Sequence, residues 1–211
     1  DKYSERYQEK NAFYDDREFV HNSFVENNVG ISTYYQEADS DVIRECRDAF
    51  VDVIMEEQET SEDFTCVMFD SYLDKGPLDT TSMMMTYSAF TFTEGQWVLG
   101  NQGIRTWMFD DANDRLIQKE QVLVEDYRAL ASEYFTEHFK NNRHLTENWT
   151  DYVADDRDNF KRVMVTGEGI RFFFKRGTVC DEEEGIIEHT VPMDVCSTWI
   201  RDEIMARYID P

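Results

Sequence analysis

The residue types that most often carry out chemistry are scattered along this sequence. Its four histidines stand at positions 21, 138, 144 and 189, and the closest two are six residues apart, a poor spacing for one helical face. No Gly-x-Ser-x-Gly elbow, phosphate-binding loop or dinucleotide fingerprint occurs. In the run Met83-Met84-Met85, strand spacing puts the first and third methionine on one face, which favours core packing over a copper or haem role. We therefore predict no catalytic residue and no cofactor.

Carboxylates are too numerous for a pair of them to identify a site. The chain of 211 residues has 45 Asp and Glu against 21 Lys and Arg, a net charge of −24. The runs 110–111, 155–156 and 182–184 could each attract a cation, but the segment 110–121 lacks the glycine that an EF-hand turn needs. Two glycosidase carboxylates cannot be located among so many candidates. We interpret the runs as solvated loops and predict no metal ligand.

The same charge excludes whole classes of partner. An acidic surface repels phosphate backbones and anionic lipid, and no stretch of the sequence concentrates Lys and Arg into a basic patch. No apolar run reaches the length of about 18 residues that a membrane span needs. The chain opens at Asp1 and ends at Pro211, which we interpret as a piece of a longer protein with any anchor upstream. We predict no nucleic-acid binding, and membrane contact only through such an anchor.

Four cysteines, Cys46, Cys66, Cys180 and Cys196, leave the redox compartment open. None belongs to a Cys-x-x-Cys pair or lies at zinc-like spacing from a histidine, so metal binding and thioredoxin-like chemistry are weak interpretations. The simplest disulfide scheme pairs Cys180 with Cys196 and Cys46 with Cys66. Buried free thiols are an equal alternative.

Amphipathic helices must be among the elements that position any site. Val42, Ile43, Cys46, Phe50, Val53 and Ile54 follow one another at helical spacing and predict a helix over 40–57. Its outer face is expected to carry Arg44, Arg47, Asp48 and Asp52. Similar stripes predict helices over 124–140 and from Asp194 to Tyr208, with a short helix near Trp149.

Strand patterns fill the rest of the chain. They cover 18–37 as one or two strands, 64–73, 80–93, 97–109 as one or two strands, 160–165, 170–174 and 186–191. A turn at Thr166-Gly167-Glu168-Gly169 indicates a hairpin. No long crossover helix separates the strands of 64–109, so we predict an α+β fold: an antiparallel sheet of hairpins with about three amphipathic helices packed on it. Residues 1–17 are a tail or irregular lead-in, and 18–211 form one compact unit from two segments, about 18–113 and 114–211.

Residues 159–196 resemble the end of an extracellular bacterial domain of uncharacterised function. The matching elements are an Asn-Phe start at Asn159-Phe160, a Thr-x-x-Gly turn from Thr166 to Gly169, the aromatic strand Phe172-Phe173-Phe174, a loop closed by Gly185 and a Val-Pro step at Val191-Pro192. Upstream, the segment from Asp114 through the 124–140 helix resembles the beginning of that domain. Residues 18–113 more loosely resemble the segment that commonly precedes it.

This pair of segments is found in lysozyme-sensing anti-sigma factors and ahead of the catalytic domain of cell-wall polysaccharide deacetylases. Ile209-Asp210-Pro211 resembles the lead-in to a deacetylase domain, whose Thr-Phe-Asp-Asp-Gly metal motif this chain lacks. The loop 176–184 lacks the Pro and Tyr that the family often carries there, and that region contributes to lysozyme recognition in the sensor branch. The resemblance therefore implies the deacetylase setting, in which this chain is not itself an enzyme.

Two functions follow as expectations. As an extracellular accessory domain, tethered through an upstream segment, the chain would bind cell-wall glycan; the candidate stacking residues are Trp97, Trp107 and Trp149, with core packing as the alternative for each. As a sensor-like domain it would capture a cationic protein such as lysozyme. The candidate residues for that partner are Asp181, Glu182, Glu183, Glu184 and Arg176, with a solvated loop as the alternative. A carboxylate hydrolase is supported only by the abundance of acids.

Overall fold

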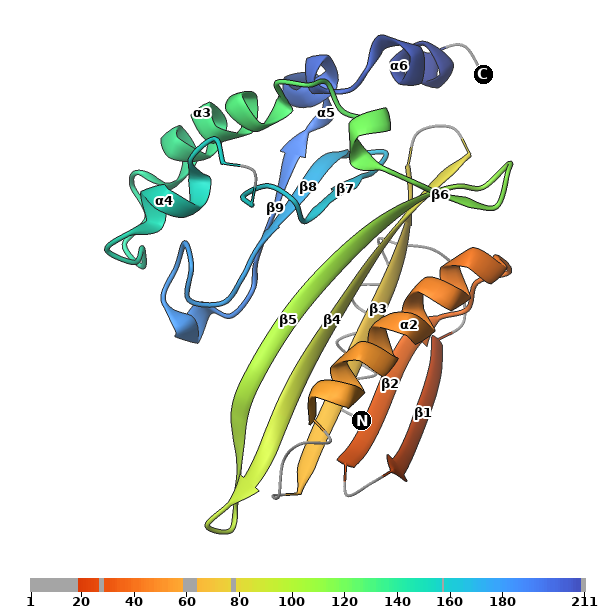
Figure 1. Ribbon diagram of the computed structural model, residues 1–211. Helices are drawn as coiled ribbons and strands as arrows, with labels where there is room; N and C mark the ends of the chain where they lie inside the picture. The colour runs from red at the N-terminus through yellow and green to blue at the C-terminus, as the bar shows by residue number, and fades with distance from the viewer. Residues whose placement is uncertain (1–18, 27–28, 59–63, 77–78, 157, 210–211) are drawn as a thin grey trace. The chain divides into compact units, whose positions relative to one another are not determined.

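The computed structural model describes residues 19–26, 29–58, 64–76, 79–156 and 158–209, and these form an α+β chain (Figure 1). One sheet has the strand order β1-β2-β3-β4-β5-β6 and the other has the order β7-β8-β9. The chain divides into two compact units: unit 1 comprises residues 1–75 and 83–102, and unit 2 comprises 76–82 and 103–211. The α+β class is confirmed. The tail predicted over 1–17 lies outside the described residues.

The observed elements follow the predicted ones closely in most places. The strands are β1 (Phe19–Glu26), β2 (Val29–Gln36), β3 (Thr65–Lys75), β4 (Thr80–Thr93), β5 (Gln96–Asp110), β6 (Arg115–Ile117), β7 (Val163–Val165), β8 (Gly169–Phe174) and β9 (Ile187–Pro192). The helices are α2 (Asp41–Gln58), α3 (Tyr127–Phe139), α4 (Trp149–Val153), α5 (Met193–Cys196) and α6 (Asp202–Ile209). Short 3-10 turns are η1 (Lys119–Gln121), η2 (Glu182–Glu184) and η3 (Ser197–Trp199).

The larger sheet is mixed and not antiparallel throughout. β1 pairs with β2 in antiparallel fashion, whereas β2 pairs with β3 in parallel, with Val29 opposite Thr65 and Tyr35 opposite Ser71. Parallel neighbours need a crossover connection, and α2 supplies it. The prediction of an antiparallel sheet is therefore wrong at this pair, because the helix predicted over 40–57 is itself the crossover.

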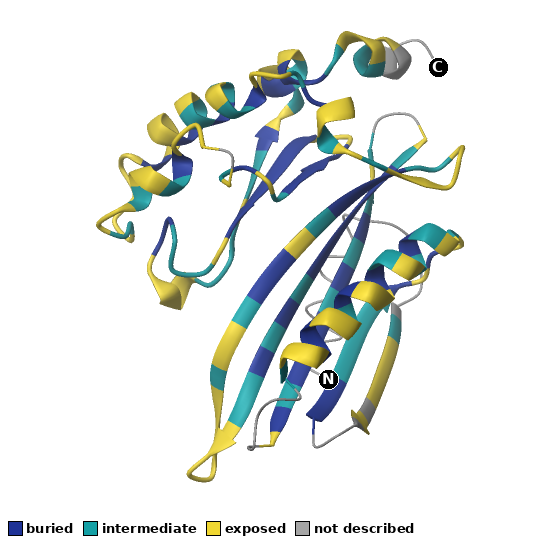
Figure 2. Ribbon diagram, viewed as in Figure 1, coloured by how far each residue is buried: buried dark blue, intermediate teal, exposed yellow. Residues whose placement is uncertain are grey.

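Helix α2 covers one face of the unit 1 sheet through a buried stripe. Its aromatic member, Phe50, has its ring 6.4 Å from that of Phe69 on β3 and 6.1 Å from that of Tyr87 on β4. Bands of buried and partly exposed residues alternate along β3 and β4 below it (Figure 2). All of Met83, Met84 and Met85 are buried, so the second methionine is not on a free face.

Unit 2 is built around an aromatic core between α3 and the β7-β8-β9 sheet (Figure 1). Phe135 on α3 is fully buried, and its ring lies 5.0 Å from that of Phe174 and 5.2 Å from that of Phe172, both on β8. All three residues of β7 and all six of β8 are buried. The side-chain hydroxyl of Ser82 also donates to the Val165 carbonyl oxygen at 3.0 Å, which ties the first residues of β4 to β7.

The turn between β7 and β8 is the predicted hairpin. The Thr166 amide donates to the Gly169 carbonyl oxygen at 2.8 Å, and Val165 lies opposite Ile170 in the register. Gly169 has a φ of +152°, and a Cβ atom there would lie 2.0 Å from the Val191 carbonyl oxygen on β9. Only glycine satisfies both the backbone angle and this close approach.

The last predicted helix is interrupted. It forms α5, the turn η3 and α6, with Ile200 extended and Arg201 outside any helix between them. The Val124 amide donates to the Trp199 carbonyl oxygen and the Arg201 amide donates to the Val122 carbonyl oxygen, both at 2.9 Å. These long-range backbone bonds replace the helical ones at this point, so the prediction of one continuous helix is wrong.

All four cysteines are free thiols in the structure, so neither disulfide pairing is present. Cys180 and Cys196 are buried, and the Cys196 thiol donates to the Val191 carbonyl oxygen at 3.3 Å. Burial raises the pKa of the Cys196 thiol to about 11, so little reactive thiolate forms at neutral pH. Cys196 therefore behaves as a core residue of unit 2.

Candidate functional site

An exposed aromatic patch lies at the turn that joins β4 to β5 in unit 1. Glu94 and Gly95 both have positive φ angles, the turn type that matches the twist of a tight hairpin. The Phe92 amide donates to the Phe64 carbonyl oxygen at 3.1 Å, which brings the segment before β3 beside this hairpin. The Trp97 ring lies 5.2 Å from that of Phe92 and 5.9 Å from that of Phe64. We call Phe64, Phe92 and Trp97 the aromatic patch.

The three tryptophans proposed as glycan platforms have different environments. Trp97 is 49% exposed, whereas Trp107 is only 8% exposed and belongs to the core. Trp149 is half-buried on the unit 2 core, with its ring 6.5 Å from that of Phe139. Only Trp97 among these three offers a large open face. Its signal in the sequence was the aromatic content alone, which does not separate exposed from buried rings.

The acidic loop of unit 2 is exposed but held in place. Arg176 Nε donates to the Glu182 carbonyl oxygen at 2.9 Å, and its guanidinium pairs with the Glu182 carboxylate at 3.4 Å. His144 Nδ1 lies 3.7 Å from a carboxylate oxygen of Glu184. Asp181 and Glu183 are exposed and make no ion pair within the described part of the chain. The structure thus brings Arg176 to Glu182.

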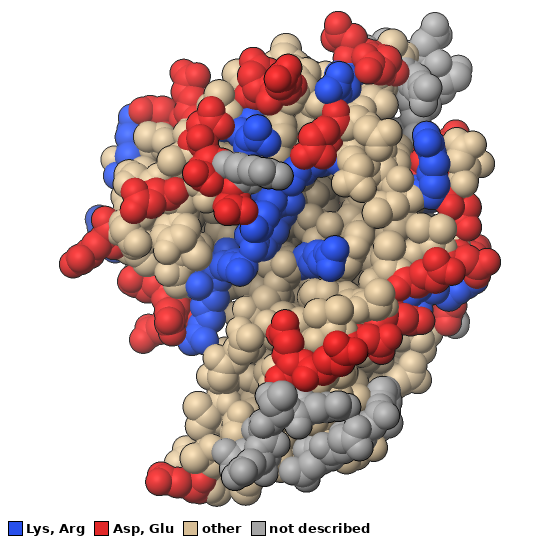
Figure 3. Space-filling model, viewed as in Figure 1, with Lys and Arg blue, Asp and Glu red and all other residues tan. Residues whose placement is uncertain are grey.

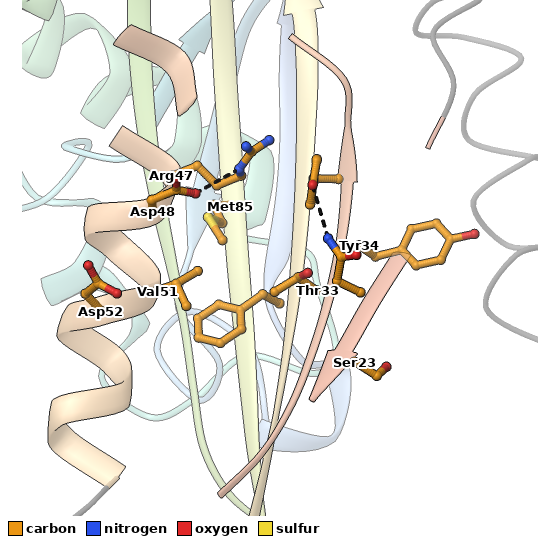
Figure 4. Close-up of a pocket in the computed structure, with 11 residues that line it drawn as sticks. Ser23, Thr33, Tyr34, Arg47, Asp48, Val51, Asp52 and Met85 are labelled. Carbon is orange, nitrogen blue, oxygen red and sulfur yellow. Dashed lines mark hydrogen bonds and ion pairs between the residues drawn. The ribbon is translucent and has the colours of Figure 1, made fainter. Parts of the chain in front are cut away.

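A cavity of about 400 Å³ opens between α2 and the sheet of unit 1 (Figure 4). Arg47 and Val51 line it from α2, and the buried residues Phe69 on β3 and Met85 on β4 also belong to its lining. The opposite wall comes from β1 and β2, and the complete lining is Asn22, Ser23, Thr33, Tyr34, Tyr35, Arg47, Asp48, Val51, Asp52, Phe69 and Met85. Sequence reasoning missed this site, because a cavity formed by elements distant in sequence leaves no local motif.

Arg47 was predicted on the outer face of its helix and is instead buried. The buried positions Ile43, Arg47, Phe50 and Ile54 follow one another by four, three and four residues. Arg47 therefore lies on the apolar stripe itself. The spacing could have indicated the burial of Arg47 from the sequence, because a charged residue within an apolar stripe faces the core.

Two histidines expected to be isolated meet in unit 2. The rings of His138 on α3 and His189 on β9 lie 4.0 Å apart between centroids, and the Tyr134 hydroxyl shares a 3.0 Å hydrogen bond with His189 Nε2. Burial first, and then the neighbouring His138, lower the pKa of His189 from 6.5 to about 4. His189 is therefore neutral at physiological pH. An open groove nearby is lined in part by Tyr134, His138 and Trp199, together with the acidic residues Glu133 and Glu137.

Cations also gather where the sequence showed no basic patch. Figure 3 shows a band of Lys and Arg side chains on a surface with many acids around it. In unit 2, burial lowers the pKa of Lys175, and the nearby charges of Arg162 and Lys161 lower it further. Burial also lowers the pKa of Lys119, which is close to the same two cations. No single stretch of sequence is basic, but separate segments of unit 2 bring these cations together on the folded chain.

Within the described ranges, no group of three or more His, Cys, Asp and Glu side chains is arranged to hold a metal ion. Among the same residues, no helix combines the length and apolar character needed to cross a bilayer.

The fold places this chain beside an uncharacterised class of α+β proteins. Neither a known family model nor a curated protein sequence matches the chain. A solved structure of a DUF3298 family protein from Pseudomonas aeruginosa PAO1 is similar with a TM-score of 0.59 and 13% identity, over 90% of this chain and 94% of that one. A DUF3298 member from Bacteroides fragilis NCTC 9343 is similar with a TM-score of 0.54 and 11% identity, over 92% of this chain and 96% of that one. At these identities the likeness establishes the fold, and it agrees with the expectation of a domain of uncharacterised function.

Proposed function

We propose that this chain is a non-catalytic, extracellular accessory domain of a cell-envelope polysaccharide deacetylase, and that it binds cell-wall glycan. The observation that carries this proposal is the aromatic patch. Sugar rings present C–H groups to aromatic faces, and an exposed tryptophan flanked by two phenylalanines supplies such a face. All three rings are exposed to solvent, so they are available for binding.

Replacing Trp97 with alanine should weaken binding of soluble peptidoglycan fragments by about tenfold or more, the effect typical of an aromatic anchor. Titration calorimetry measures this directly. Because Trp97 is exposed, the circular dichroism spectrum and the thermal unfolding midpoint should stay close to those of the wild type.

The matched control is Leu116→Ala, which removes an exposed apolar side chain on β6, outside the aromatic patch. Its glycan affinity should remain within about twofold of the wild type, as is usual for a residue outside the contact. An equal loss in both variants, or no glycan binding by the folded wild type, would contradict the proposal.

A second candidate function is capture of a cationic protein such as lysozyme. The observation that favours it is the exposed acidic loop, in which Glu182 is paired with Arg176 and Glu184 lies 3.7 Å from His144. The fixed loop leaves Asp181 and Glu183 to face a basic partner, and the net charge of −24 would steer that partner toward the chain.

Neutralising the two unpaired acids tests this candidate without breaking the loop. We expect the double variant Asp181→Asn and Glu183→Gln to lower lysozyme affinity about five- to tenfold at low salt. At higher salt the affinities of the wild type and the variant should become more similar, because salt screens the charges. Surface plasmon resonance at two ionic strengths measures it. Glu125→Gln with Glu203→Gln changes the net charge equally at exposed positions elsewhere in unit 2. Equal effects of the two double variants would point to general attraction and not to this loop.

A further inference from the structure

Arg47 is a buried cation with unused hydrogen-bonding capacity. Its side chain is only 10% exposed, and its Nε atom contacts Asp48 Oδ1 at 3.5 Å, a long distance for a charged pair. Asp48 itself is largely in solvent. The guanidinium carbon lies 3.8 Å from the centre of the Tyr35 ring, which fixes the plane of the group by stacking.

The two terminal nitrogens of Arg47 have no hydrogen-bond partner within the described part of the chain. A guanidinium has five N–H donors, and a buried charge is costly unless it is paired. These nitrogens lie on the wall of the cavity between α2 and the sheet (Figure 4). An anion that enters the cavity would supply the missing partner.

The surroundings of Arg47 select the kind of anion. A planar guanidinium binds a carboxylate through two parallel hydrogen bonds. Asp48 and Asp52 line the same cavity, and their negative charges disfavour a dianion such as phosphate. Val51 and the ring of Tyr34, both partly exposed, provide an apolar surface for an organic body, and the volume falls within the range of small-molecule sites, about 300–1,000 Å³.

We propose that the cavity of unit 1 binds a small organic monocarboxylate, whose carboxylate pairs with the terminal nitrogens of Arg47 and whose body rests on Val51 and Tyr34. The Asn22 side-chain amide, which donates to the Tyr35 hydroxyl at 3.2 Å, holds the β1–β2 side of the cavity together. This site is separate from the aromatic patch, and its test does not depend on glycan binding.

The experiment titrates the full chain with benzoate at constant ionic strength. Titration calorimetry measures affinity, and nuclear magnetic resonance follows the Arg47 Nε–H signal. We expect saturable binding with a shift of that signal. Benzamide, which has the same shape without the charge, should bind at least about tenfold more weakly, since it cannot form the charged bidentate pair.

Two variants on the same helix make the test specific. Arg47→Met keeps an unbranched apolar stem and should abolish benzoate binding. Arg44→Met is the matched control, because Arg44 is a partly exposed arginine of α2 that pairs with Asp41 and does not line the cavity. It should keep the wild-type affinity within about twofold, as expected for a residue without ligand contact.

Three results would overturn the proposal. The folded wild type could show no saturable benzoate binding, or benzamide could bind as tightly as benzoate, which would leave only an apolar cavity. Sulfate could bind as tightly as benzoate, which would replace the monocarboxylate site with a general anion site. The wild-type titrations decide these points even if Arg47→Met fails to fold.

Discussion

Replacing Phe135 with alanine should lower the free energy of unfolding of unit 2 by about 3–5 kcal/mol, the usual cost of deleting a fully buried phenylalanine. Phe135 has no exposed surface, and its ring lies within 5.0–5.8 Å of those of Phe139, Phe160, Phe172 and Phe174. These rings come from α3, from β8 and from the segment before β7, so the cavity left behind would be shared by the whole core. Urea unfolding followed by tryptophan fluorescence measures the loss.

A Trp97→Phe background makes this measurement specific to unit 2. Of the four tryptophans, Trp107, Trp149 and Trp199 belong to unit 2, and Trp97 belongs to unit 1. In the same background Phe92→Ala is the control, because it removes a phenylalanine that is 46% exposed; we expect it to cost less than about 1 kcal/mol. Similar losses in the two variants would contradict the central place of Phe135 in the core.

Acidification should destabilise the fold through His189. The pKa of this ring is about 4 in the folded chain against 6.5 for an unperturbed histidine. The unfolded state therefore binds a proton that the folded state refuses between these values, and stability present above pH 6.5 is lost as the pH falls toward 4. Because the ring is only partly buried, we expect a contribution of about 1–3 kcal/mol, less than the full shift would give.

The variant His189→Gln isolates this contribution from that of the many carboxylates. Glutamine retains a polar partner for the Tyr134 hydroxyl, which now bonds His189 Nε2, but it does not titrate. The difference in unfolding free energy between wild type and variant should be constant above about pH 7 and should change by about 1–3 kcal/mol between pH 6.5 and 4. A constant difference across the whole range would show that burial does not keep His189 neutral.

Local sequence patterns predicted most of the helices and strands, but not how all of the strands pair or where the last helix is interrupted. The stripe from Ile43 to Ile54 predicted α2, and the turn ending at Gly169 predicted the β7–β8 hairpin, because both depend on neighbours in sequence. The parallel pairing of β2 with β3 was missed, since strand order depends on contacts across the crossover helix. The break after Trp199 was missed for the same reason: its backbone bonds are to Val122 and Val124, far along the chain.

For the candidate sites, too, the sequence indicated residue types but not the contacts between distant residues. The acidic residues 181–184 could be identified from charge alone, but not the pairing of Glu182 with Arg176 or the approach of His144 to Glu184. Aromatic content suggested Trp97, Trp107 and Trp149 together, and only the packing of the chain separates the exposed ring from the core ring. The pairing of His138 with His189 joins a helix to a strand that follows it by about fifty positions, and no spacing rule could indicate it.

The division of β4 and β5 between the two units has a practical consequence for anyone who wishes to make either unit alone. A fragment that stops at Lys75 would lack residues 83–102, and with them Met85 of the cavity lining and Trp97 of the aromatic patch. A fragment that starts at Gly103 would lack residues 76–82, and with them the Ser82 hydroxyl that bonds Val165. No single cut in the polypeptide releases a complete unit, so excision, proteolytic trimming and domain transplantation all require the uninterrupted chain or a redesigned order of its segments.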